Sequence, residues 1–540
     1  MSKIAQYLNE HILGEITSSK AIRQRFSRDG SVLSIQPELV MFPRVTNDIR
    51  KAARFSWQLA EKGHVMPLSV RGGGTDTSGG SLGKGLVINT ATHLNNIIYI
   101  ALKEKDRFVH VQPGVNFKSL NDTLNWHGLW VPACPDSIGA TVGGAVASNL
   151  GGKLSGKYGL TGDFVTRLEV VLANGDLIET SRLSKHEFNK KKGLQTLEGE
   201  IYRKIDGLIE DNQELINQKI SDSQVDSTGY SGIANVKRRD GSFDLTPLFI
   251  GSQGTLGIIS EVVLRTDYAS KDQSVMVAVL PTFEAGRDVA DVIQGLDPIA
   301  LEIFDGNLFY SAKENGKSYA FLNNNNGNGI IGSVVYIQFG DFHDRTRERK
   351  IKKAEKVLSK YNASVITSKD HSIEELSAIH DVSDSIYVSE AGGESWPPLV
   401  EGASIPSERM EEFSRAISEL ATKHHVELPL RIRVLDGTVF TRPVLHLEKI
   451  TDRQKVFKLI GEYSQLVSRV GGKFIYEGSE GRLKSNSAYA LLDEGVVKLY
   501  EQVRAVFDPF GTMSPGVKQP NEIKDLVAIL RSSYDVADLV

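Results

Sequence analysis

Two glycine-rich segments carry the clearest chemical signal in this sequence. The first runs from Arg71 to Gly80 and the second from Gly139 to Asn149, each next to runs typical of strands. Glycine has no Cβ, so backbone N–H groups in such segments can approach phosphate oxygens closely, and the chain can adopt positive φ values. Two such segments in one N-terminal half predict loops that hold a diphosphate between backbone amides.

The elements around the first segment must present it at the end of a strand. Strands are expected over 39–43, 68–71 and 85–90, and Thr46 is expected to cap a helix that ends near Gly63. A Rossmann dinucleotide fingerprint would open a helix after its glycines, whereas a strand follows here. The pattern therefore weakens a Rossmann interpretation.

The rest of the N-terminal half mixes helices with antiparallel strands. A strand is expected over 108–112, followed by a helix that carries Phe117 and Leu120. Asn174-Gly175 lies between apolar runs at 167–172 and 176–180, and this dipeptide predicts a β-hairpin.

A second module begins near Asp267. Expected strands at 274–280, 333–339 and 363–367 alternate with expected helices at 283–296 and 345–361, which predicts a sheet covered by helices on one face. Further helices at 407–424 and 452–470 bracket a strand pair around Asp436-Gly437, and the tail after Pro520 is expected to dock as a short helix. We therefore predict domains at 1–267 and 268–520 and a C-terminal tail at 521–540.

Composition limits the classes of function. The chain has 540 residues, which is long for one core, and its net charge of -4 gives no reason to expect nucleic acid. No apolar run reaches the roughly 18 residues of a membrane span, and the N-terminus does not resemble a signal peptide, so a cytoplasmic location is the default expectation. Cys134 is the only cysteine, which excludes a disulfide, a Cys-ligated zinc site and a Cys-ligated iron–sulfur cluster within this chain.

With segments 251–257 and 507–516 added to the two glycine segments, the chain resembles the FAD-linked oxidases of the vanillyl-alcohol oxidase, or PCMH, type. It looks most like their branch of D-lactate dehydrogenases, glycolate oxidases and D-2-hydroxyglutarate dehydrogenases. The resemblance implies an α+β fold, in which a PCMH-type FAD-binding domain of two subdomains precedes an α+β, ferredoxin-like cap domain that covers the flavin.

The resemblance also implies which residues hold FAD. The diphosphate segment would comprise Arg71, Gly72, Gly73, Gly74, Thr75, Asp76, Ser78, Gly79 and Gly80. The adenine side and the isoalloxazine would be held by Pro135, Ser137, Thr141, Gly143, Gly144, Ser148, Asn149, Gly151, Gly152, Lys157, Tyr158 and Gly159. The pocket would be closed by Gly254, Thr255, Gly257, Ile258 and Ile259.

The mode of FAD attachment can also be predicted. Covalent members of the superfamily often carry a histidine just after the first glycine run, where this chain has Thr75 and Asp76, so noncovalent attachment is expected. Cys134 stands where close relatives usually have an aspartate. A thioether between Cys134 and the flavin is the alternative to a small buried residue at this position.

The chain departs from the family in its metal ligands. Relatives carry His-x-Gly-Asp-Gly-Asn-x-His and Glu-His-Gly, which bind a divalent metal ion beside the flavin. Here the first motif reads Arg433 to Phe440 without either histidine, and in the second only Glu477 survives, because Gly478 replaces the histidine that acts as base. One carboxylate makes a poor metal site, so none is expected.

Three residues are the catalytic candidates: Arg433, Glu477 and His380. Arg433 could replace the charge of the metal and bind a carboxylate with its planar fork, or it could pair with Glu477 or Asp436 in a cap without hydroxy-acid activity. His380 stands roughly where relatives have an arginine that grips the substrate carboxylate. Further positive charge in the cap, which favours an anionic substrate, comes from Arg442, Arg482 and Lys484.

The resemblance implies an FAD-dependent oxidoreductase that transfers hydride from a small anionic 2-hydroxy acid, similar to D-lactate or glycolate, to flavin N5 without a metal. The reoxidant would be a quinone, a cytochrome, an iron–sulfur partner subunit or oxygen. Two alternatives stay open: a degenerate FAD-binding subunit or structural flavoprotein, and a flavin transferase similar to alkyl-dihydroxyacetone-phosphate synthase. A homodimer and a position at the inner face of a membrane are also left open.

Overall fold

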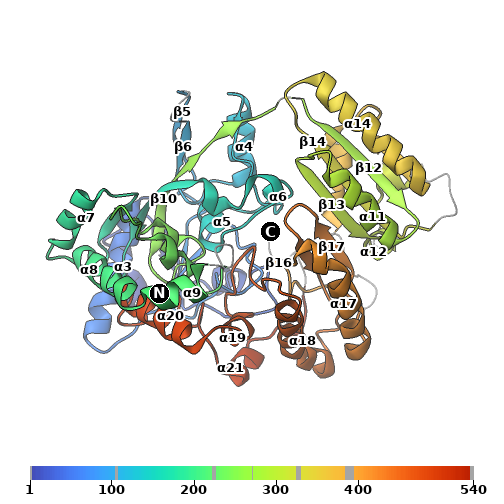
Figure 1. Cartoon of the computed structure of the whole chain (residues 1–540). Helices are drawn as coiled ribbons and strands as arrows, with labels where there is room; N and C mark the ends of the chain where they lie inside the picture. Colours follow the sequence, from blue (N-terminus) through green and yellow to red (C-terminus); the bar gives the residue numbers. More distant parts are fainter. Residues whose placement is uncertain are drawn as a thin grey trace.

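The computed structural model describes residues 3–103, 107–221, 227–270, 272–314, 316–323, 330–382 and 395–534. The fold is α+β, as predicted: an N-terminal part of two mixed subdomains lies beside a cap built on one large sheet (Figure 1). The cap's sheet and the long helices packed on it lie at the right of Figure 1.

The first subdomain contains a four-stranded sheet of order β1-β2-β4-β3. Its strands are β1 (Glu15–Thr17), β2 (Leu39–Phe42), β3 (Leu68–Arg71) and β4 (Leu86–Asn89), and its helices are α1 (Lys3–Asn9), α2 (Lys20–Arg25) and α3 (Thr46–Glu61). Strands β2 and β3 pair with β4 in parallel, so the first glycine segment leaves β3 at one edge of the sheet before the chain returns into β4. This confirms the predicted strand–helix–strand unit.

The N-terminus of α3 differs in detail from the prediction. Thr46 is the first helical residue and not the cap, which is Val45. The carboxylate of Asp48 instead accepts hydrogen bonds from the backbone of Val45 at 3.4 Å and of Arg44 at 2.9 Å. An acceptor at the third helical position can satisfy these donors because it reaches back over the first turn.

The second subdomain contains a five-stranded antiparallel sheet of order β5-β6-β10-β8-β9. Its strands are β5 (Ile97–Ala101), β6 (Phe108–Val111), β8 (Val165–Val171), β9 (Leu177–Thr180) and β10 (Ile258–Arg265), and β7 (Leu129–Trp130) pairs separately with β11 (Asp267–Tyr268). Its helices are α4 (Phe117–Asn125), α5 (Val142–Ser148), α6 (Ser155–Tyr158), η1 (Thr161–Phe164), α7 (Lys185–Lys192), α8 (Leu197–Asp211), α9 (Gln213–Lys219), η3 (Ser231–Asn235) and α10 (Thr246–Phe249). The predicted hairpin is confirmed, with φ of 82° at Gly175.

The second glycine segment is a short helix, α5, where a loop was predicted. The Thr141 side chain caps it by accepting a hydrogen bond from the Gly144 amide, and Asn149 ends it in the left-handed conformation with φ of 49°. Val142, Ala145 and Val146 are fully buried in the subdomain core. Burial of these apolar residues stabilises the helix despite its glycines, because packing outweighs intrinsic propensity.

The cap contains a seven-stranded antiparallel sheet of order β15-β12-β14-β13-β17-β18-β16. The strands are β12 (Ser274–Leu280), β13 (Ala300–Asp305), β14 (Ser333–Phe339), β15 (Ser364–Thr367), β16 (Ala403–Ser404), β17 (Leu430–Arg433) and β18 (Thr438–Thr441). One face packs against α11 (Phe283–Gln294), α14 (Asp344–Leu358), α17 (Met410–His424) and α18 (Ile450–Arg469). Strand β13 was not predicted, because Glu302 interrupts its apolar run.

The prediction that helices cover only one face of this sheet is wrong. Alternate residues of β12 enter two different cores: Met276, Ala278 and Leu280 pack against the long helices, while Val275, Val277 and Val279 face the other way. That second face is covered by the short helices α12 (Gly306–Glu314), α13 (Ala320–Asn323) and α15 (Ile373–Ser377) and by Trp130 and Leu154 of the N-terminal part. The cap sheet therefore shares a core with the N-terminal part.

The C-terminal segment returns to the N-terminal part. After α19 (Ser485–Tyr489), helix α20 (Glu494–Phe507) buries Leu499, Val503 and Phe507 in the core of the second subdomain. The tail forms α21 (Ile523–Ala528), which confirms the predicted short helix, and then runs beside residues 30–34, with the Arg531 amide donating to Val32 at 2.8 Å. The domain boundaries drawn from the sequence stay a prediction. No helix in the described ranges is long and apolar enough to cross a membrane.

Candidate functional site

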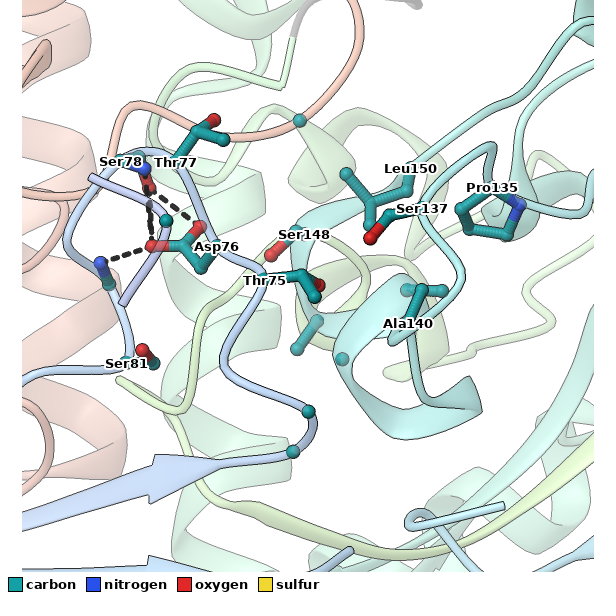
Figure 2. Close-up of a pocket in the computed structure, with 18 of the residues that line it drawn as sticks. Thr75, Asp76, Thr77, Ser78, Ser81, Pro135, Ser137, Ala140, Ser148 and Leu150 are labelled. Carbon is teal, nitrogen blue, oxygen red and sulfur yellow. Dashed lines mark hydrogen bonds between the residues drawn. The ribbon is translucent and has the colours of Figure 1, made fainter. Parts of the chain in front are cut away.

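A cavity of about 700 Å³ lies where the two glycine segments meet the cap. This volume is within the range of known cofactor pockets. Figure 2 shows its N-terminal wall, with Thr75 and Asp76 on the first segment, Ala140 and Ser148 on the second, and Ser137 just before the second. Most of the predicted FAD residues line it, namely Gly72, Gly73, Gly74, Thr75, Asp76, Ser78, Gly80, Pro135, Ser137, Thr141, Gly143, Gly144, Ser148, Gly151, Gly254, Gly257, Ile258 and Ile259.

The two glycine segments touch each other at distances that only glycine permits. A Cβ added to Gly73 would lie 1.9 Å from the Gly139 carbonyl oxygen, and one added to Gly72 would lie 2.2 Å from Thr141 Oγ1. Real Cβ atoms do not approach other heavy atoms this closely, so neither glycine can be replaced without moving the other segment. The glycines bring two backbone walls together beside the cavity.

Asp76 organises the first segment. Its carboxylate accepts hydrogen bonds from the Gly80 amide at 2.6 Å and from the Ser78 amide at 3.2 Å (Figure 2). The amides of Gly73, Gly74 and Thr75, which also line the cavity, have no acceptor within the part of the chain that the structure describes. Unpaired amides beside a cavity fit a diphosphate, since its oxygens only accept hydrogen bonds. The donor set therefore fits FAD.

The remaining predicted FAD residues support the walls and are not among the described cavity-lining residues: Arg71, Gly79, Asn149, Gly152, Lys157, Tyr158, Gly159 and Thr255. The Arg71 guanidinium donates to the Arg28 carbonyl and lies 5.2 Å above the Phe26 ring. Burial lowers the pKa of Arg71. Lys157 pairs with Asp297, a residue of the cap. Direct contact of these residues with FAD stays a prediction.

On the cap side, Glu302 lies between the side chains of Arg431 and His380. Glu302 Oε1 accepts from Arg431 Nε at 3.1 Å and NH2 at 2.8 Å, and its Oε2 faces His380 Nε2. Arg431 NH2 also donates to Asp136 of the N-terminal part at 2.6 Å. Burial alone would raise the pKa of Glu302 and of Asp136, but Arg431 and His380 outweigh it and lower both. Of this group, His380, Arg431 and Asp136 line the cavity.

Arg433 and Glu477, two of the predicted catalytic residues, form a buried ion pair. Arg433 NH1 lies 2.8 Å from Glu477 Oε2, while Arg433 Nε and NH2 bind Asp436 at 3.0 and 2.7 Å. Only Glu477 lines the cavity; Arg433 is fully buried behind it. The structure thus shows the pairing alternative of the sequence analysis. A direct role for Arg433 in substrate binding stays a prediction.

The carboxyl group of Glu477 has a raised pKa. Burial raises its pKa; Arg433 opposes this, while the nearby charges of Asp136 and Asp436 add to it. Its Oε2 atom is buried and accepts no hydrogen bond of good geometry from any described residue. A cavity-facing carboxyl with a raised pKa is typical of groups that exchange protons with a ligand.

The sequence analysis missed several cavity residues of the cap and one of the C-terminal tail, Tyr534. Arg431, Phe440, Glu401 and Tyr534 line the cavity beside Arg442 and Lys484, which were predicted only as added positive charge. Alternation along β17 could have found Arg431, since it shares a face with Arg433 two residues later. Burial lowers the pKa of Lys484, whose Nζ donates to the Glu401 carbonyl at 3.1 Å.

Cys134 is not among the described residues that line the cavity, although its neighbour Pro135 is. The thiol is partly buried, and burial together with the charge of Asp136 raises its pKa to about 12. In the described ranges, no group of three or more His, Cys, Asp or Glu residues is arranged to hold a metal ion.

Comparison with known protein families gives two separate matches. Residues 37–181 match the FAD binding domain, and residues 269–517 match the C-terminal domain of FAD linked oxidases. The chain belongs to the FAD-linked oxidase family. Its N-terminal part therefore carries an FAD-binding domain, and the cavity lies between this domain and the FAD-oxidase cap.

Relatives of this FAD-linked oxidase are named for hydroxy acids. It is 26% identical to D-2-hydroxyglutarate dehydrogenase of Pantoea ananatis (strain AJ13355), and the alignment covers 93% of this chain and 50% of that protein. It is 25% identical to glycolate oxidase subunit GlcD of Bacillus subtilis (strain 168), and the alignment covers 89% of this chain and 88% of that protein. It is also 25% identical to D-lactate dehydrogenase of Archaeoglobus fulgidus, with 84% of this chain and 85% of that protein covered. The chain spans about half the length of the D-2-hydroxyglutarate dehydrogenases.

Solved structures share the fold of this FAD-linked oxidase. The 4-ethylphenol oxidase from Gulosibacter chungangensis superposes with a TM-score of 0.67 at 14% identity, covering 95% of this chain and 96% of that one. An alkyldihydroxyacetonephosphate synthase superposes with a TM-score of 0.63 at 13% identity, covering 95% and 86%. At these identities the likeness concerns the fold alone.

Proposed function

We propose that this FAD-linked oxidase oxidises a small anionic 2-hydroxy acid, similar to D-lactate or glycolate, without a metal ion. The observation that carries the proposal is Glu477, a carboxyl with a raised pKa that faces the same cavity as the glycine segments. Its counter-charge is the guanidinium of Arg433, at 2.8 Å. Relatives named for 2-hydroxy acids support the substrate class.

The reaction removes a hydride and a proton from the substrate. Bound FAD supplies the acceptor for the hydride that leaves the carbinol carbon. The hydroxyl proton needs a base, and the Glu477 carboxylate accepts it as the carbon–oxygen bond becomes a carbonyl, giving a 2-oxo acid. Turnover would also need an electron acceptor, either a quinone, a cytochrome, an iron–sulfur partner or oxygen. This acceptor, a homodimer and the cellular location stay predictions.

Arg433 makes a metal ion unnecessary for holding Glu477. A guanidinium is always charged and donates hydrogen bonds in a fixed plane, so it can hold two carboxylates at once. It holds Asp436 by hydrogen bonds and Glu477 by an ion pair. The positive charge beside Glu477 also opposes the rise of its pKa and so favours the ionised form that a base requires.

A second candidate function is an FAD-binding subunit without hydroxy-acid activity. Arg433 favours it, because its contacts to Asp436, Thr438 and the Gly152 carbonyl keep it behind the cavity wall. The flavin-transferase alternative gains no support from His424-His425, the one pair of adjacent histidines in the sequence. His424 pairs with Glu462 and His425 ends α17, and neither is among the described residues lining the cavity.

The test is anaerobic absorbance of the FAD-loaded protein during addition of D- and L-2-hydroxy acids. Bleaching of the flavin by one compound, slowed in Glu477→Gln and unchanged in the exposed control Glu419→Gln, would support the proposal. Flavin that no compound bleaches would favour the subunit without activity. Equal bleaching rates in Glu477→Gln and the unmodified protein would remove the carboxylate from the mechanism.

A further inference from the structure

Arg431 presents one unpaired edge to the cavity. Its Nε and NH2 atoms are engaged with Glu302 and Asp136 at 2.6 to 3.1 Å. NH1, which carries two N–H donors, has no partner among the described residues. The residue is only 6% exposed and lines the cavity. An unpaired donor pair on a largely buried arginine beside a cavity can bind a ligand that accepts hydrogen bonds.

The charge around Arg431 leaves room for an anion. His380 Nδ1 faces the Ser377 carbonyl at 2.9 Å and Nε2 faces the Glu302 carboxylate. The Lys153 backbone amide binds Asp136, and its Nζ binds Ser377. The cations Arg431 and Lys153 balance the carboxylates of Glu302 and Asp136, so an anion beside Arg431 NH1 does not face an excess of negative charge.

The guanidinium is also fixed in orientation. It lies 4.9 Å from the centre of the Phe440 ring and 5.4 Å from that of Phe304. Asp136 holds it from the FAD-binding domain, while Glu302 holds it from the cap. A donor held from several sides loses little conformational freedom when a ligand arrives, which strengthens binding.

On the basis of the proposed function, we propose that Arg431 NH1 binds the carboxylate of the substrate and that Glu302 and His380 are positioning residues for it. Arg433, two residues later on β17, does not share this role, because Asp436, Thr438, the Gly152 carbonyl and Glu477 use its nitrogens. The two arginines therefore have different roles: Arg433 pairs with the base Glu477, and Arg431 binds the substrate carboxylate.

The test separates anion binding from turnover. Oxalate has no carbinol C–H bond and cannot be oxidised as a hydroxy acid, so it serves as the probe. It is titrated into the FAD-loaded protein and its dissociation constant is measured from the change in flavin absorbance. Arg431→Lys, which keeps the charge but loses the fork, is expected to raise the dissociation constant about tenfold or more. The exposed Arg345→Lys on α14 is the control and should leave it unchanged.

Chemical rescue excludes a merely structural effect. In Arg431→Ala, added guanidinium ion should restore part of the oxalate affinity, since it can occupy the vacated place between Glu302 and the ligand. If neither Arg431 variant retains FAD, Phe440→Leu replaces them; loss of the supporting ring should weaken oxalate binding about threefold. Unchanged affinity in Phe440→Leu would then overturn the inference.

Each outcome decides between the two proposals. Equal oxalate affinity in Arg431→Lys and the unmodified protein, or no oxalate binding at all, overturns the inference. Weakened oxalate binding in a protein whose flavin no hydroxy acid bleaches supports the anion site and removes the proposed oxidation. Bleaching by a hydroxy acid with the same KM in Arg431→Lys keeps the proposed oxidation and overturns the anion site.

Discussion

Arg433 NH1 and Glu477 Oε2 lie 2.8 Å apart, and of this pair only Glu477 reaches the cavity. The guanidinium therefore acts on the cavity through the carboxylate that it holds. Because Asp436 shares the same guanidinium, Glu477 receives only part of its stabilisation, and burial keeps the Glu477 pKa raised.

Glu477→Gln should slow the reduction of bound flavin by the substrate about 10²- to 10⁴-fold, as expected for the loss of a general base. Since the pKa of Glu477 is raised, its carboxylate fraction grows only above the ordinary range of glutamate. The rate of the unmodified protein should therefore rise with pH through that raised pKa, and the slope should vanish in the variant. Rapid-mixing absorbance over a pH series measures both. A variant that keeps both the rate and the slope would contradict the role of Glu477.

Arg433→Met should lower the free energy of unfolding by about 3–5 kcal/mol, because it leaves Asp436 and Glu477 buried without their cation. Denaturant unfolding of the FAD-loaded protein measures this. Arg415→Met, which removes an exposed pair with Glu411, is the matched control and should cost at most about 1 kcal/mol. Similar losses in the two variants would show that the buried pair contributes no more than a surface one.

Gly73→Ala should abolish or strongly weaken FAD binding, because the new Cβ would collide with the Gly139 carbonyl oxygen and separate the two glycine segments. Gly207→Ala is the control. It lies in α8 with nothing within 4 Å of an added Cβ, so alanine there should stabilise the helix by about 0.5–1 kcal/mol. The ratio of flavin to protein after purification measures the outcome. Normal FAD content in Gly73→Ala would show that the contact between the segments is not needed.

FAD should be released by acid precipitation from both the unmodified protein and Cys134→Ser, because Cys134 does not line the cavity. The thiol should also react slowly with iodoacetamide near neutral pH, since burial raises its pKa to about 12 and little thiolate forms. Flavin that stays with the precipitated unmodified protein but not with Cys134→Ser would establish a thioether instead.

Asp29→Asn should change how stability depends on pH. Burial and the nearby charge of Asp76 raise the pKa of Asp29 to about 6. For a raised carboxyl pKa, the stabilising contribution is complete below the pKa of the unfolded chain and is lost as pH rises through the folded value. Between about pH 4 and about pH 7, the unmodified protein should therefore lose about 2 kcal/mol relative to the asparagine variant. If the free energy of unfolding depends on pH in the same way in both proteins, the pKa of Asp29 is not raised.

Local pattern was enough to predict much of the fold. The apolar period of α3, the alternation along β12 and the Asn174-Gly175 turn each depend on neighbours within a few residues. The prediction failed where contacts between distant residues decide the structure. Glycines 143 and 144 suggested a loop, but burial of Val142 and Val146 against the second subdomain makes this segment a helix.

The sequence by itself determined the family, the presence of two glycine-rich walls and the loss of the metal-binding histidines, because each is read from residue types at short spacing. Only the tertiary structure decided which arginine of β17 faces the cavity. Arg431 and Arg433 share one face of the strand, so alternation cannot distinguish them. Their partners can: Glu302 and Asp136 lie 129 and 295 residues from Arg431 in the chain, and only folding brings them to its guanidinium.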